Sequence, residues 1–199
     1  IWLLRSEGVD YATGATTNPG NDDNVTVIEF NCQTNQFPTT YTFSTTPQAG
    51  SHVVNMANTF GEFDYPDAVT FPLGTMIMNG GTYIIAHASS DPIIIAVTNQ
   101  TYSSLSNGDD VYALTLTGAT AANYTIIDIV GDMQGDPGSG WPVAGVNNAT
   151  KDHTLIRKSS VCSGNPTELG SFGIDAGSSE WIVEAKNYWD NISLHTSSC

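Results

Sequence analysis

The chain has 199 residues, 40% of them hydrophobic and only 13% charged, a composition that excludes intrinsic disorder and allows one sizeable core. The formal net charge of −15, with only five Lys and Arg residues, argues against nucleic-acid partners and against an anionic membrane surface. No apolar run approaches the roughly 18 residues that a membrane-spanning helix needs, so no membrane span is expected.

Alternating apolar and polar residues predict β-strands along most of the chain. Turn signals such as Asn79-Gly80-Gly81 and Asn107-Gly108 separate them. Helical spacing occurs only between Ser178 and Tyr188, where we expect a single turn or a short helix. The predicted strands are Trp2–Glu7, Val25–Asn31, Thr39–Ser44, Val69–Phe71, Thr82–His87, Ile93–Thr98, Val111–Thr117, Tyr124–Val130 and Thr154–Lys158.

Two of these segments carry an expectation about burial. In Val111–Thr117, Tyr112, Leu114 and Leu116 point to one face and the intervening residues to the other, which predicts a half-buried strand. The run Ile93-Ile94-Ile95 is continuously apolar and predicts a strand buried on both faces. Short strands separated by turns favour an all-β fold, namely an antiparallel β-sandwich. We expect residues 1–199 to form one domain.

An acidic pair, Asp109 and Asp110, directly follows the tight-turn dipeptide Asn107-Gly108. Loop carboxylates usually cap backbone amides or face water. The pair is therefore interpreted as the corner where a strand begins, and not as a metal or catalytic site.

No arrangement of residues predicts catalysis. Serines are abundant, but no G-x-S-x-G elbow occurs, so no Ser–His–Asp triad is expected. We expect His87 and His195 to be structural, hydrogen-bonded side chains. The protein is predicted not to be an enzyme. The chain's histidines are His52, His87, His153 and His195.

Calcium is the main chemical alternative. The turns Asn21–Asn24 and Asp132–Asp136 are rich in oxygen ligands, which Ca²⁺ prefers. Neither turn has the spacing of an EF-hand loop, and no Cys/His spacing suggests zinc. We therefore expect no cofactor, with calcium at one of these turns as the alternative.

Several features favour an extracellular location. Lys is scarce, the polar residues are mainly Thr, Ser and Asn, and a cysteine stands at the C-terminus. Five Asn-X-Ser/Thr sequons are glycosylation candidates, a mild excess over chance. They begin at Asn24, Asn99, Asn123, Asn148 and Asn191.

The segment N-G-D-D-V-Y-A-L, at Asn107–Leu114, is the first of several motifs in the C-terminal half. These motifs resemble bacterial lamin-tail domains, whose NGDDAVAL stretch is similar to Asn107–Leu114, and they follow in that family's order. The N-terminal part is similar more loosely, at Leu3–Gly8, Ile28–Asn31 and Gly80–Ala86. The matching segments are Asn107–Leu114, Asp128–Asp132, Asp136–Gly138 with Trp141, Thr154–Lys158, Val161–Asn165, Ser179–Val183, and His195-Thr196 before Cys199.

The resemblance implies an immunoglobulin-like sandwich of a secreted protein, without catalytic activity of its own. It also implies a disulfide between Cys162 and Cys199, worth about 3–4 kcal/mol by loop-closure arguments. Cys32 is then left over, either as a buried free thiol or as a bond to a neighbouring molecule.

The first four residues, Ile1, Trp2, Leu3 and Leu4, are strongly apolar. A strand at the start of the chain either lies in its own sandwich or is exchanged with a neighbour, which can build a homopolymer. The sequence thus predicts an extracellular structural or adhesive subunit that self-associates by strand exchange and carries glycans. The alternative is an accessory module of a secreted hydrolase or nuclease, which binds carbohydrate or a surface, with Trp141, Trp181 and Trp189 as candidates for stacking on sugars. In the competing interpretation, Trp141 and Trp181 are core residues.

Overall fold

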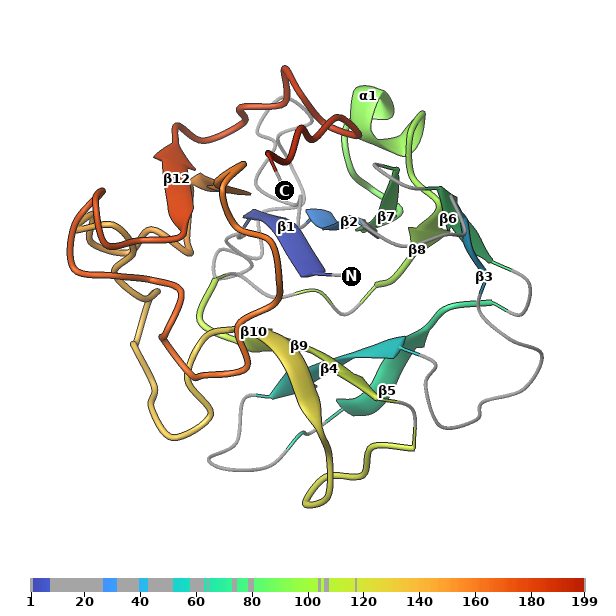
Figure 1. Ribbon diagram of the computed structural model, residues 1–199, viewed down its shortest axis with the longest axis horizontal. Coiled ribbons are helices and arrows are strands. Elements are labelled where there is room, and N and C mark those ends of the chain that lie inside the picture. The colour runs from blue at the N-terminus through green and yellow to red at the C-terminus, as the bar shows by residue number, and fades with distance from the viewer. Residues whose placement is uncertain are drawn as a thin grey trace.

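The fold is known from a computed structural model, in which strands dominate (Figure 1). All-β architecture is therefore confirmed. The described residues are 2–7, 27–31, 40–42, 52–57, 63, 65–72, 75–78, 81–103, 105, 108–116 and 118–198.

The larger of the main sheets has six strands in the order β12-β11-β1-β2-β7-β8. All neighbours are antiparallel except β7 and β8, which run parallel. The N-terminal strand β1 thus lies in the middle of the sheet. The strands are β1 (Trp2–Glu7), β2 (Val27–Asn31), β7 (Thr82–Ala86), β8 (Gln100–Thr101), β11 (Thr154–Arg157) and β12 (Trp181–Glu184).

A second sheet has four antiparallel strands in the order β10-β9-β4-β5, and β3 pairs with β6 as a separate ribbon. Strands β4 and β6 were not predicted, because their sequences do not alternate clearly. The bounds are β3 (Thr40–Thr42), β4 (His52–Ala57), β5 (Tyr65–Thr70), β6 (Met76–Met78), β9 (Val111–Leu116) and β10 (Ile126–Val130).

One hydrophobic cluster joins the two larger sheets, which Figure 1 shows above and below the centre of the molecule. The six-stranded sheet contributes Ile85, Leu155 and Trp181, and the four-stranded sheet contributes Leu114 and Ile129, all of them buried. Burial of such side chains stabilises the fold by about 1.5–3 kcal/mol each.

Strand β9 is more buried than its alternation predicts. Val111 through Thr115 are all buried, and only Leu116 is partly exposed. β9 lies between β10 and β4, and the chain that follows β10 covers it near Gly131, where an added Cβ would lie 2.9 Å from Val111 Cγ2. The prediction of a half-buried strand was wrong, because a central strand can be covered on both faces.

The run Ile93–Ile95 belongs to a helix, so the predicted strand was wrong. Helix α1 (Pro92–Ile95) begins after Asp91, whose carboxylate accepts a hydrogen bond of 2.8 Å from the Ile93 amide. An Asp cap followed by Pro at the first helical position is a helix start signal. Only Ile94 is buried, whereas Ile93 is 61% exposed.

The helix expected between Ser178 and Tyr188 is also wrong, because this region contains β12. Its residues pair in register with β11, with Trp181 opposite Arg157 and Glu184 opposite Thr154. In the part of the chain that the structure describes, there is no helix with the length and apolarity required to cross a membrane.

A smaller apolar cluster covers the β7 side of the six-stranded sheet. Ile192, near the C-terminus, is buried against Ile84, Ala86 and Ile94, and Trp189 packs against the same group. The C-terminal segment is thereby attached to both β7 and α1.

Candidate functional site

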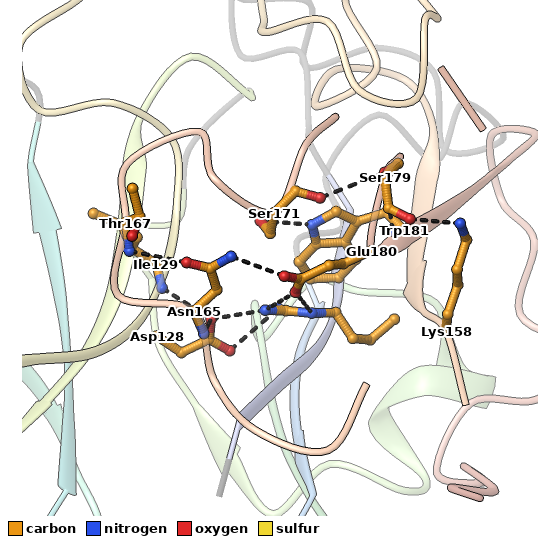
Figure 2. A network of polar contacts seen from close by, with 10 residues as sticks. Asp128, Ile129, Lys158, Asn165, Thr167, Ser171, Ser179, Glu180 and Trp181 are labelled. Atoms are coloured by element: carbon orange, nitrogen blue, oxygen red, sulfur yellow. Dashed lines mark hydrogen bonds and ion pairs between the residues drawn. The ribbon is translucent and has the colours of Figure 1, made fainter. Parts of the chain in front are cut away.

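A buried ion pair connects the two larger sheets (Figure 2). The Arg157 guanidinium, on β11, forms two parallel hydrogen bonds with the Asp128 carboxylate, on β10, at 2.9 and 3.2 Å. Both residues are 1% exposed. Bidentate pairs of this kind are the strong ones, and their partners cannot be removed singly without leaving a buried charge.

Further donors saturate the Asp128 carboxylate. Its Oδ1 accepts hydrogen bonds from the amides of Asn165, at 2.9 Å, and of Ile129, at 3.1 Å. The Asn165 segment can approach this closely because residue 164 is glycine, where an added Cβ would lie 2.4 Å from the Ile127 carbonyl oxygen. The loop after β11 is therefore fastened to β10.

Glu180 closes the other side of the network. Its Oε2 lies 2.9 Å from Arg157 Nη2 and accepts from Nε at 3.0 Å, while its Oε1 accepts from Asn165 Nδ2 at 2.8 Å. The Arg157 guanidinium also lies 4.4 Å from the centre of the Trp181 ring, a cation–π contact. The indole N–H of Trp181 donates to Ser171 Oγ at 2.9 Å.

This network acts as a structural clamp between the sheets. Arg157 carries one positive charge against the two negative charges of Asp128 and Glu180, and it is hydrogen-bonded to both carboxylates. The sequence contained a signal for it, since Asp128 and Arg157 interrupt apolar strands. Their pairing was not predicted.

The acidic corner before β9 has a structural explanation. Gly108 has a φ of 108°, and its carbonyl oxygen accepts a hydrogen bond of 2.6 Å from the buried Thr150 hydroxyl. The same Thr150 oxygen accepts from the Trp141 amide at 2.8 Å. Asp109 and Asp110 follow at the entrance of β9. Gly108 thus helps to position this corner.

A second carboxylate pair lies in the Asp132 turn. Asp132 Oδ1 accepts from the Gln134 amide at 2.8 Å, and its side chain lies near that of Glu168. Burial, followed by the charge of Asp132, raises the pKa of Glu168. Within the described residues, no group of three or more His, Cys, Asp or Glu side chains is placed to hold a metal ion.

Glu168→Gln is expected to raise the free energy of unfolding at pH 7, by less than about 1 kcal/mol. The raised pKa means that the folded protein favours the protonated form of Glu168 more than the unfolded chain does. The protonated carboxyl therefore stabilises the fold fully at pH values below the unfolded pKa, and this stabilisation is lost as the pH rises through the folded pKa. Urea unfolding of both proteins at pH 7 and pH 3.5 measures the difference. An equal gain at both pH values would show that the charge of Glu168 is not the cause.

The histidines are distributed over different parts of the fold. His87 directly follows β7 and its Nδ1 accepts from the Ser89 amide at 3.0 Å. His153 precedes β11 and its Nδ1 lies 3.0 Å from the Glu184 carbonyl oxygen. His52 is in β4, and His195 is in the C-terminal segment. The His87 contact is local, whereas His153 contacts the end of the neighbouring strand β12.

The tryptophans named for sugar stacking differ in burial. Trp141 and Trp181 are buried in the main core, at 5% and 1% exposure, so their faces are not open to a ligand. Trp189 is half-buried against Ile192 and its neighbours. The carbohydrate-binding alternative therefore loses two of its three aromatic residues.

The predicted glycosylation sites lie in different environments. Asn123 and Asn148 are exposed in turns. Asn99 is exposed, but its Oδ1 accepts from the Ile84 amide at 2.8 Å, and Asn191 is half-buried. The Thr of the Asn148 sequon is Thr150, whose hydroxyl already has the structural role described above. Asn24 lies outside the described residues.

The cysteines are described only in part. Cys162 is disulfide-bonded, and Cys32 and Cys199 lie outside the described residues. Next to Cys199, the amide and the hydroxyl of Ser198 both donate to the Ser159 carbonyl oxygen, at 2.8 and 3.0 Å. The C-terminus therefore approaches the Cys162 loop, and the Cys162–Cys199 pairing stays a prediction. Ile1 and the acidic turn at Asp22 and Asp23 also lie outside.

Comparison with known proteins gives no match: no family model, no curated protein and no solved structure matches this chain. The resemblance to lamin-tail domains consequently stays a proposal.

Proposed function

We propose that the protein is a secreted, non-enzymatic subunit with an immunoglobulin-like sandwich of the lamin-tail kind, which assembles into an extracellular structural or adhesive polymer by exchanging β1. The position of β1 inside the six-stranded sheet carries this proposal. The sequons, the scarcity of Lys and the disulfide at Cys162 support the extracellular location.

Strand β1 has a partner on each side. It pairs with β11 through Arg5↔Ile156 and Glu7↔Thr154, and with β2 through Trp2↔Asn31 and Leu3↔Phe30. Removal of β1 would leave two facing strand edges with unpaired amide and carbonyl groups. Such a slot binds an added strand through main-chain hydrogen bonds. The best occupant is the same strand from a second copy.

The connection between β1 and β2 is long enough for exchange. Residues 8–26 separate the two strands. A chain of this length can extend to about 60 Å, since each residue spans at most about 3.3 Å or slightly more. This reach exceeds the diameter of a domain of this size, so β1 can reach a neighbour while the rest of the sheet stays in place.

Exchange between copies builds an open assembly. Each subunit would give β1 to one neighbour and accept β1 from another, which is a heterologous contact that need not close into a ring. The facing sheets and the Arg157 clamp would keep each subunit folded around the inserted strand.

A reversible lock tests the proposal. Arg5 and Glu29 are Cα partners across β1 and β2, and antiparallel partners lie about 4.5–5.5 Å apart, within the range that a disulfide spans. The double variant Arg5→Cys with Glu29→Cys is expected to stay monomeric when oxidised and to polymerise after reduction. Electron microscopy and size-exclusion chromatography measure the assembly.

The single variant Arg5→Cys and the unmodified protein, each with and without reductant, are the matched controls for effects on the native cysteines. Polymers of equal length from the locked and the reduced protein would refute strand exchange. A monomer under every condition would refute the polymer itself.

A further inference from the structure

The C-terminal segment crosses the six-stranded sheet at the end where β1 begins. It has an anchor on β7, where Ile192 is buried and the Thr82 hydroxyl donates to the Ser193 carbonyl oxygen at 3.3 Å. It has a second anchor after β11, where Ser198 donates twice to Ser159. Strands β2 and β1 lie between these two anchors in the sheet.

The strand register places both anchors at the same level. Thr82 is opposite Asn31, and Asn31 is opposite Trp2. The pairs Glu7↔Thr154 and Arg5↔Ile156, continued along both strands, bring Trp2 level with about Ser159. A line from the first anchor to the second therefore passes the end of β2 and then the beginning of β1.

The length of the segment fits only a direct crossing. Three inter-strand spacings of about 4.8 Å separate β7 from β11, a distance of about 14 Å. The five residue steps from Ser193 to Ser198 extend to about 17 Å. Figure 1 shows this segment, in dark red, returning from α1 towards β1. The extended segment is only slightly longer than the distance between the two strands, so it cannot follow a longer path around the sheet.

We infer that Trp189–Ser198 is a strap that holds β1 in its own sheet, and that opening the strap is the step that controls exchange of β1 between copies. The control of exchange rests on the proposed function, whereas the retention of β1 does not. A Cys162–Cys199 disulfide would close the strap one residue beyond its second anchor.

Hydrogen exchange followed by mass spectrometry tests the strap in the full chain. Two variants open it independently: Ile192→Asp at the first anchor, and Cys162→Ser with Cys199→Ser at the second. In both, amides of Trp2–Glu7 are expected to exchange at least tenfold faster, while those of β9 keep their protection. Leu194→Asp is the matched control, because Leu194 is in the same strap and is 67% exposed.

Unchanged exchange in β1 would overturn the inference, and so would an equal acceleration in β1 and β9, which would indicate general destabilisation. The amount of polymer separates the two proposals. Faster β1 exchange with more polymer supports both. Faster β1 exchange with unchanged polymer keeps the strap as the element that retains β1 and refutes its control of assembly.

Discussion

Replacing Arg157 with Met is expected to lower the free energy of unfolding by about 3–5 kcal/mol. The substitution leaves the Asp128 carboxylate buried at 1% exposure without its bidentate partner. The amides of Asn165 and Ile129 still donate to it, but they carry no charge. Equilibrium unfolding in urea, followed by tryptophan fluorescence, measures the loss.

The double variant Asp128→Leu with Arg157→Met is the decisive control. Replacing both members of a buried pair by apolar residues is often neutral, so most of the lost stability should return. Glu180→Gln should cost less than Arg157→Met, because the Glu180 side chain is 27% exposed. If Arg157→Met proves as mild as Glu180→Gln, the clamp does not stabilise the contact between the sheets.

Gly108→Ala is expected to cost about 2–6 kcal/mol, as the sum of two separate effects. A φ of 108° strains any residue that has a Cβ, by about 1–3 kcal/mol. The added Cβ would also lie 2.4 Å from the Thr150 carbonyl oxygen, and overpacking of this kind costs about 1–3 kcal/mol. Thermal and urea unfolding both report the change.

Gly118→Ala isolates the first of these effects. Gly118 has a φ of 82°, and an added Cβ would meet nothing within 4 Å. Gly118→Ala should therefore lower the free energy of unfolding only through backbone strain, by about 1–3 kcal/mol. Equal losses at positions 108 and 118 would mean that the close approach to Thr150 has no energetic consequence.

The sequence predicted strands where apolar and polar residues alternate, and failed where a local signal or a tertiary contact decided the outcome. The predicted bounds of β1, Trp2–Glu7, agree with the structure. In contrast, Asp91 and Pro92 start a helical turn, although the three isoleucines that follow them suggested a strand. At β12, pairing with β11 overrides the spacing that suggested a helix.

The candidate site could be predicted only as separate residues. Asp128 and Arg157 are conspicuous as charges within apolar strands, but they are 29 residues apart and belong to different sheets. The pairing depends on how the two sheets face each other, which no local pattern encodes. The same holds for Gly108 and Thr150, which are 42 residues apart.

The placement of β1 between β2 and β11 affects how the chain can fold while it is being translated. β2 emerges soon after β1, but β11 follows only roughly 150 residues later, which takes about 7–30 s at ordinary rates of translation. During that interval one side of β1 has no partner within its own nascent chain. Because open strand edges invite pairing with other chains, crowded polysomes would favour contacts between copies before each copy is complete.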